Sequence, residues 1–324
     1  MLLVGSYLLA IFTMAHFNFN INNLFTAVYQ FDPAFLEPGG LIQNPLDRLS
    51  LGIGLLFGTA ALPHILMRFY TVPSANNARS SVLWGMTFIG LFQILTPILG
   101  FGALLLVGLS TIESVDKGGN LAAPLLAQMV GGGAGSIGGE LFMAFLSAIA
   151  FITIIAVVSG LSLAASSAFA YDFWIRIVRG GKENHKEQLF VSRVTALGVG
   201  ALSIIIALLL QNANVAYLTG LAFAIAATAN LPVLIFSLYW KGLTTAGAIT
   251  GMIGGLVIAI LTVVTGPEFA GENALFPLKN PGLISIPAGF LLTYIASLLT
   301  KKEHDSELKF KEVAVRSQTG IGAE

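Results

Sequence analysis

The sequence contains no cysteine and few charged residues. Of its 324 residues, 16 are Lys or Arg and 16 are Asp or Glu, so charged residues make up 10% of the chain. Soluble domains carry about 25% charged residues. Without cysteine there is neither a disulfide framework nor a thiolate metal site. The formal net charge of zero gives no electrostatic basis for a nucleic-acid partner, and we expect none.

Apolar residues dominate instead. They make up 56% of the chain, and the mean hydropathy is +0.85. A chain of this size cannot hide so much apolar surface from water, so its expected solvent is lipid. The N-terminal run MLLVGSYLLAIFTMAHF has no small-residue cleavage site, and we interpret it as part of a membrane span rather than a signal peptide. We predict an all-α integral membrane protein.

About eight stretches come close to the roughly 20 apolar residues that a spanning helix needs. The predicted spans are residues 1–15, 49–69, 82–108, 141–171, 194–210, 215–239, 246–265 and 283–300. We treat residues 1–300 as one transmembrane domain and 301–324 as a tail. The first span is short, as a clipped helix would be.

Basic residues gather on one side of these spans. All Lys and Arg except Arg48, Lys117 and Lys279 fall in the loops after the second, fourth and sixth spans or in the tail. Cytoplasmic loops carry an excess of Lys and Arg. We therefore expect a multi-pass protein of the inner (plasma) membrane with both ends in the cytoplasm.

The second span is interrupted by helix breakers in the stretch FGTAALPHILMRFYT. Pro63 has no amide hydrogen and disturbs the carbonyl of Thr59, four residues earlier. A helix opened near residues 57–61 would expose main-chain groups in mid-membrane, as in the discontinuous helices of secondary transporters. The alternative is a proline kink, with Gly58 easing helix packing.

The fourth span carries several serines among small residues. One reading is a packing face on which each hydroxyl donates to a carbonyl of the preceding turn. The other is an alkali-cation site, because hard cations take oxygen ligands and the spacing Ala156-x-x-Ser159 places a carbonyl and a hydroxyl on one side of the helix. Beyond this span we expect Asp172 and Arg176 to pair, since they are four residues apart.

Two patterns in the later spans predict helix contacts or a polar lining. In the sixth span, ATANLP (227–232) brings Asn230 toward the middle of an apolar helix, where it can line a cavity or relieve packing. GMIGG (251–255) has the small-xxx-small spacing of closely packed helices. There is no phosphate loop, metal-spaced cluster or nucleophile elbow, and no acid–base pair lies at membrane depth, so we expect neither an enzyme nor a bound metal.

Several long motifs, in order, resemble the sodium/solute symporter family, and most closely its cation/acetate symporters, or acetate permeases. The motifs are FGTAALPHILMRFYTV, GFGALLLVG, GLAFAIAATANLPVLIFSLYWKGLTTAGAITG and the tail RSQTGIG. The resemblance implies part of a LeuT-type (APC-like) inverted-repeat helical bundle. The first span would then be the last helix of the first repeat, the next five would be the second repeat, and the last two would be additions.

The resemblance also implies binding residues. The cation site would use Ala156 and Ser159, with Gly160 where the family has a second hydroxyl and Ser162 as its substitute. The second span would be the broken helix of the second repeat. Its implied substrate-binding residues are Phe57, Gly58, Thr59 and Pro63, and the sixth span would add Asn230.

The implied function is secondary active transport: sodium-coupled uptake of acetate or a similar short-chain monocarboxylate by alternating access. The alternative is a sodium symporter of the same fold for an amino acid, urea or a longer monocarboxylate. Expected partners are the small organic anion, sodium and the lipid bilayer, with sodium as coupling ion and no other cofactor. We expect the N-terminal helices of the same transporter to be missing before Met1, so that this polypeptide alone does not transport.

Overall fold

The computed structural model describes residues 2–40, 42–69, 71–182, 184–211, 213–301 and 306–320. Within these ranges the chain is built of helices and contains no strand, as the sequence predicts. It divides into two compact units, which are discontinuous in sequence. The first comprises Met1–Leu36 and Leu83–Asn214, and the second comprises Glu37–Val82 and Val215–Glu324.

Seven helices of the described residues are long and apolar enough to cross a membrane. They are Pro45–Met67, Ala75–Leu106, Ile137–Val178, His185–Leu209, Val215–Tyr239, Thr245–Val264 and Gly282–Leu299. Each overlaps a predicted span. Long apolar helices satisfy all their main-chain groups internally, which is what lipid requires.

The predicted first span is not among these seven helices. α1 (Leu2–His16) has 15 residues and is about 22 Å long, which is less than the roughly 30 Å of a bilayer core. It reaches span length only together with α2 (Ile21–Phe31), across a bend of 72°. The bend follows from left-handed φ angles of 54° at Asn18 and 52° at Phe19, which end the first helix.

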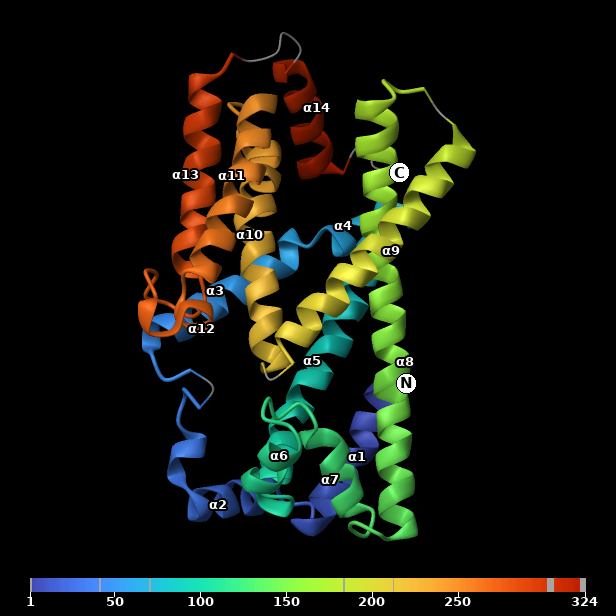
Figure 1. Cartoon of the computed structure of the whole chain (residues 1–324), viewed down its shortest axis with the longest axis vertical. Helices are drawn as coiled ribbons and strands as arrows, with labels where there is room; N and C mark the ends of the chain where they lie inside the picture. Colours follow the sequence, from blue (N-terminus) through green and yellow to red (C-terminus); the bar gives the residue numbers. More distant parts are fainter. Residues whose placement is uncertain are drawn as a thin grey trace. The chain divides into compact units, whose positions relative to one another are not determined.

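The first unit contains both long and short helices. Its elements, drawn in Figure 1, are α1, α2, η1 (Pro33–Leu36), most of α5 (Ala75–Leu106), α6 (Leu109–Val115), α7 (Ala122–Val130), α8 (Ile137–Ala168), the π-helix η2 (Phe169–Val178) and α9 (His185–Leu209). Its apolar core contains Leu9, Ala103, Ile112, Leu126 and Ala127. This core joins α1, α5, α6 and α7.

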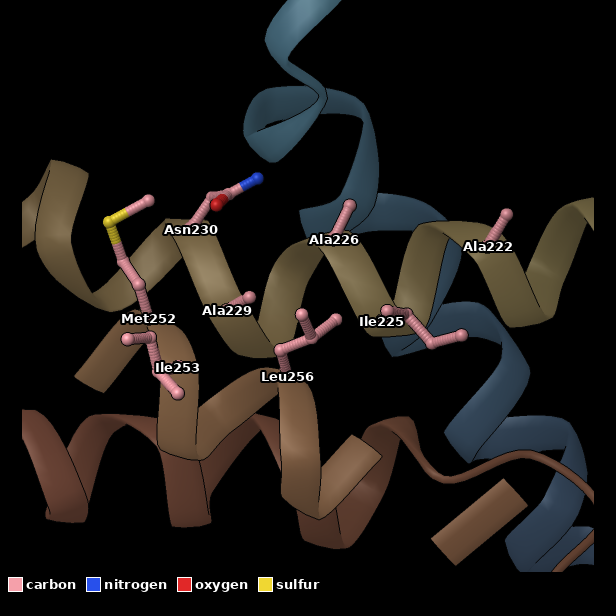
Figure 2. A pocket seen from close by; sticks show the side chains of 8 residues that line it. All are labelled: Ala222, Ile225, Ala226, Ala229, Asn230, Met252, Ile253 and Leu256. Carbon is pink, nitrogen blue, oxygen red and sulfur yellow. The ribbon is translucent and has the colours of Figure 1, made fainter. Parts of the chain in front are cut away.

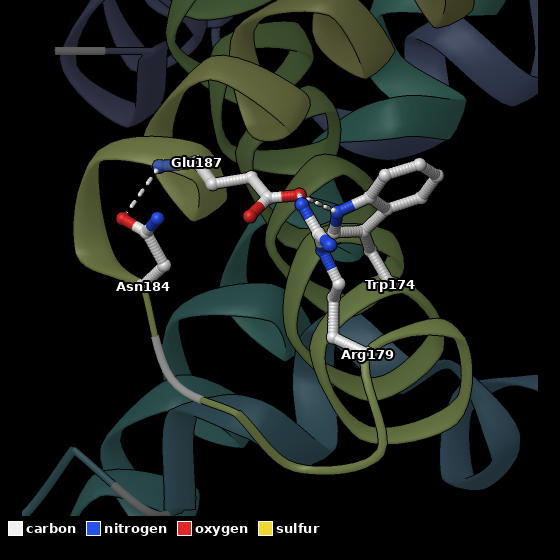
Figure 3. Close-up of polar contacts among 4 residues, drawn as sticks. All are labelled: Trp174, Arg179, Asn184 and Glu187. Atoms are coloured by element: carbon white, nitrogen blue, oxygen red, sulfur yellow. Dashed lines mark hydrogen bonds and ion pairs between the residues drawn. The ribbon is translucent and has the colours of Figure 1, made fainter.

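The π-helix that prolongs α8 is tied to the first turn of α9 by Glu187. Its carboxylate accepts a hydrogen bond from Trp174 Nε1 at 2.9 Å and one from Arg179 Nε at 2.7 Å, as Figure 3 shows. The Glu187 amide donates to Asn184 Oδ1, which caps α9. One carboxylate therefore fixes the turn between the two long helices.

The predicted pair of Asp172 and Arg176 is wrong. Among the described residues, Arg176 makes no ion pair with Asp172, and its guanidinium lies 5.0 Å from the ring centroid of Tyr171. The π-helix explains the difference, because its wider turn no longer places residues four apart over one another.

The second unit is a helical bundle with a broken helix at one side. Its elements are α3 (Pro45–Ala61), α4 (Pro63–Phe69), α10 (Val215–Tyr239), α11 (Thr245–Val264), α12 (Pro267–Ala270), η3 (Gly271–Asn273), α13 (Gly282–Leu299) and α14 (Ser306–Thr319). α10 packs against α3, α11 and α13, and α11 packs against α13 (in Figure 1, α3 is blue and the other three run from gold to red).

Small residues every four positions bring α11 and α13 into close contact, which confirms the prediction from GMIGG. The buried residues on α11 are Gly247, Gly251, Gly255 and Ala259. Those on α13 are Ser285, Gly289, Thr293 and Ser297. A Cβ on the first two glycines would overlap Ser297 and Thr293 respectively, so close approach depends on their lacking a side chain.

Polar contacts join the start of α3 to the start of α13. Asp47 is only 3% exposed, and its Oδ1 accepts hydrogen bonds from the amides of Lys279 at 2.6 Å and Asn280 at 3.2 Å. Ser50 Oγ donates to the Asn280 carbonyl at 2.7 Å and accepts from the Leu283 amide at 2.8 Å. These bonds cap α13 and fix the first half of the broken helix to the bundle.

Replacing Gly251 with alanine is expected to destabilise the second unit by about 1–3 kcal/mol, because the new Cβ would lie 2.8 Å from Thr293 Cβ. The control is Gly52→Ala in α3, where an added Cβ meets nothing within 4 Å and helix propensity favours alanine by up to about 1 kcal/mol. Unfolding in mixed detergent micelles measures both. Equal changes in the free energy of unfolding of the two variants would contradict the packing argument.

Asp47→Ala is expected to lower the free energy of unfolding by about 2–4 kcal/mol, since two main-chain amides lose their acceptor in a buried setting. The matched control is Glu268→Gln, which removes an exposed ion pair to Lys279 with a 3.8 Å separation. That pair is expected to contribute less than about 1 kcal/mol. The same micelle titration compares them, and a control loss as large as that of Asp47→Ala would refute the assignment.

Candidate functional site

The helix break lies at Leu62, between α3 and α4. α3 ends at Ala61, Leu62 adopts φ −73° and ψ 118°, and α4 begins at Pro63. A proline excludes the α conformation from the residue before it and pushes that residue into the extended region. It also withholds the amide that would bond to the Thr59 carbonyl. The sequence therefore breaks the helix one residue ahead of the proline.

The predicted opening near residues 57–61 is placed too early. These residues are wound into α3, and Gly58 packs against α10, where an added Cβ would lie 2.6 Å from the Phe223 carbonyl oxygen. The glycine thus permits close packing, and it does not open the main chain. Both sequence interpretations hold in part, because the helix is broken at Leu62 and closely packed at Gly58.

Asn230 satisfies the carbonyl that the break leaves behind. In an unbroken helix, the Ala61 carbonyl would accept from the amide of Ile65. That amide donates to the Leu62 carbonyl at 3.1 Å instead. The Ala61 carbonyl accepts from Asn230 Nδ2 at 3.0 Å, and Ala61 is completely buried. The side-chain amide of Asn230, on α10, therefore caps the C-terminal end of α3.

A cavity of about 420 Å³ lies beside this contact. It is lined by Ala222, Ile225, Ala226, Ala229 and Asn230 from α10 and by Met252, Ile253 and Leu256 from α11 (Figure 2). Asn230 is the one polar side chain among these residues. Met252, Ile253 and Leu256 are all more than 40% exposed, so this cavity is an open groove rather than an enclosed site.

The other predicted substrate residues do not line this cavity. Phe57 is 40% exposed on α3, and the Thr59 hydroxyl donates to the Leu56 carbonyl at 2.8 Å. Pro63 is exposed at the start of α4. Of the five residues predicted for the substrate, the structure brings Asn230 to the break and to the cavity.

The predicted cation residues lie on α8, in the first unit. Ala156, Ser159 and Gly160 are exposed, and Ser162 is half-buried. In the described part of the chain neither serine hydroxyl has a hydrogen-bond partner, whereas Thr153, on the same helix, donates to the Ile149 carbonyl at 2.8 Å. The back-bonded arrangement expected for a packing face is therefore absent at these two serines.

The sequence did not predict that α11 contributes to the cavity. Met252, Ile253 and Leu256 carry no polar signal, and the resemblance assigned their helix to the additions outside the repeat. The signal was indirect, because the small residues of GMIGG pack α11 closely against its neighbours. In the ranges that the structure describes, no group of three or more His, Cys, Asp or Glu could hold a metal ion.

Comparison with known proteins agrees with these features. Residues 1–255 match the sodium:solute symporter family. A Bacillus subtilis (strain 168) protein described as "Uncharacterized symporter YwcA" is 42% identical over 336 aligned positions, which cover the whole chain and 64% of that relative. The chain thus spans slightly less than two thirds of the relative's length. The family match over residues 1–255 and the 42% identity along the whole chain show that the chain belongs to the sodium:solute symporter family.

Proposed function

We propose that the whole protein takes up acetate or a similar short-chain monocarboxylate together with sodium, by alternating access. Family membership implies a sodium-coupled transporter of a small solute rather than an enzyme. The observation that carries the finer proposal is the break at Leu62, with Asn230 at its carbonyl end and an apolar cavity beside it. Secondary transporters place their substrate sites at such breaks.

The cavity supports a monocarboxylate through its chemistry. The Asn230 amide has two N–H groups, of which one donates to Ala61, so the second is left for a carboxylate oxygen. The alkyl part of the solute would contact Met252, Ile253 and Leu256. Phe57, Gly58, Thr59 and Pro63 belong to the proposal as residues of the broken helix on either side of Leu62, outside the lining of the cavity.

The second candidate is the same transport reaction with a longer monocarboxylate. A volume of about 420 Å³ falls in the range of small-molecule sites and far exceeds one methyl group. The apolar side chains that line it favour a longer alkyl chain over the single methyl group of acetate.

For the cation we propose Ala156, Ser159 and Ser162 on α8 as oxygen ligands, with Gly160 allowing close approach of a further ligand. Main-chain carbonyls and hydroxyls suit a hard monovalent cation. The two hydroxyls without a partner support this assignment. We further propose a plasma-membrane location, with residues 1–300 as one transmembrane domain and the tail in the cytoplasm.

The proposal predicts sodium-dependent uptake of labelled acetate into vesicles that contain the whole protein. Replacing sodium by choline at equal ionic strength is the control, and uptake is expected to fall to background because no coupling ion remains. Unlabelled propionate and butyrate are expected to compete, and urea and alanine are not. Uptake that persists in choline, or competition by urea alone, would overturn the proposal.

Ser159→Ala is expected to raise the sodium concentration for half-maximal uptake roughly tenfold, since it removes one cation ligand worth about 1.4 kcal/mol. Ser147→Ala, at an exposed position on the same helix, is the matched control and is expected to leave the sodium dependence unchanged. Uptake measured over a series of sodium concentrations separates the two. The same sodium dependence in both variants would remove Ser159 from the site.

A further inference from the structure

The two halves of the broken helix are held to the second unit very differently. α3 is fixed along its length: Asp47 and Ser50 bond to the start of α13, while Gly54 and Gly58 touch α10 through their main chain. α4 has only seven residues and follows α3 directly in the chain, and its His64 makes a contact of its own. Leu62 between them is half-buried. A half that is fixed along its length and a short half therefore meet at one extended residue.

The hydrogen bond from Asn230 sits at this junction. It spans 169 residues of sequence and ends on the last residue of α3. Ala61 is also part of the apolar contact with Ala227, Leu231 and Ile286. In such surroundings a carbonyl without a donor is costly, because no water replaces the lost bond. By donating to the Ala61 carbonyl, the Asn230 side chain removes the free-energy cost of leaving this buried carbonyl without a partner.

We propose that Asn230 is a positioning residue: its amide latches the carbonyl end of α3 to α10, and release of this bond frees Leu62 and α4 to move while α3 stays in the bundle. Discontinuous helices re-pack in this way when few junction residues absorb the change in φ and ψ. The inference deepens the proposed function, since it rests on the break being the substrate site. It gives Asn230 two roles, which are holding the end of α3 and binding the solute.

The absence of cysteine from the chain provides a direct test. Leu62→Cys introduces a single thiol at the break, and its initial rate of reaction with N-ethylmaleimide in membrane vesicles reports the access of water and reagent. Leu56→Cys, on the exposed face of α3, gives a reference thiol on the fixed half. Sodium and organic anions are left out, so the measurement does not depend on transport.

Each thiol is combined with Asn230→Leu, which keeps a side chain branched at Cγ but cannot donate to Ala61. Labelling at position 62 is expected to rise roughly tenfold, the factor that corresponds to a lost hydrogen bond to a buried carbonyl. Labelling at position 56 is expected to stay the same. Ser237→Ala is the matched control on α10, because its hydroxyl bonds within its own helix to Leu234.

Unchanged labelling at position 62 would overturn the latch, and so would an equal rise at both positions, which indicates general loosening. If Asn230→Leu does not fold, Asn230→Ala is judged by the same two rates. The outcome is independent of the uptake experiment. Absent uptake with a latch that opens would refute the transport proposal alone, and normal uptake with unchanged labelling would refute the latch alone.

Discussion

A helix that is broken inside a membrane must find partners for the main-chain groups that the missing turn leaves behind. Pro63 creates this demand, because it removes an amide and forces Leu62 out of the helical conformation. Asn230 meets it from a helix far along the sequence by donating to the Ala61 carbonyl. One constraint on hydrogen bonding in lipid therefore connects the break at Leu62 with the cap that Asn230 provides.

That contact requires helices to approach more closely than large side chains allow. Gly58 lets α3 reach the main chain of α10 at Phe223, and Gly255 lets α11 reach the main chain of α10 at Thr228. Lipid tails give apolar helices little hydrophobic reason to associate, so close packing and polar contacts supply the stability. Small residues thus place Asn230 within reach of Ala61 and bring α11 to the cavity wall.

The sequence predicted the helical class, seven of the spans, the break beside Pro63 and the polar role of Asn230, because composition and proline chemistry are local signals. It missed the partner of Asn230, since a contact across 169 residues leaves no local pattern. It placed the opening at Gly58, because a glycine for close packing and a glycine for an irregular main chain look alike in sequence. The pair of Asp172 and Arg176 failed for a related reason, as nothing local marks the π-helix.

The bond between Asp47 and Asn280 has a consequence for biosynthesis. The two residues are 233 positions apart, so at about 5–20 residues per second a ribosome needs roughly 10–50 s to deliver the amides that the carboxylate will accept. During that interval the Asp47 side chain lacks the two main-chain amides from which it accepts in the folded protein. The nascent chain therefore needs water, a headgroup or an insertase to shelter α3 until its C-terminal companions emerge.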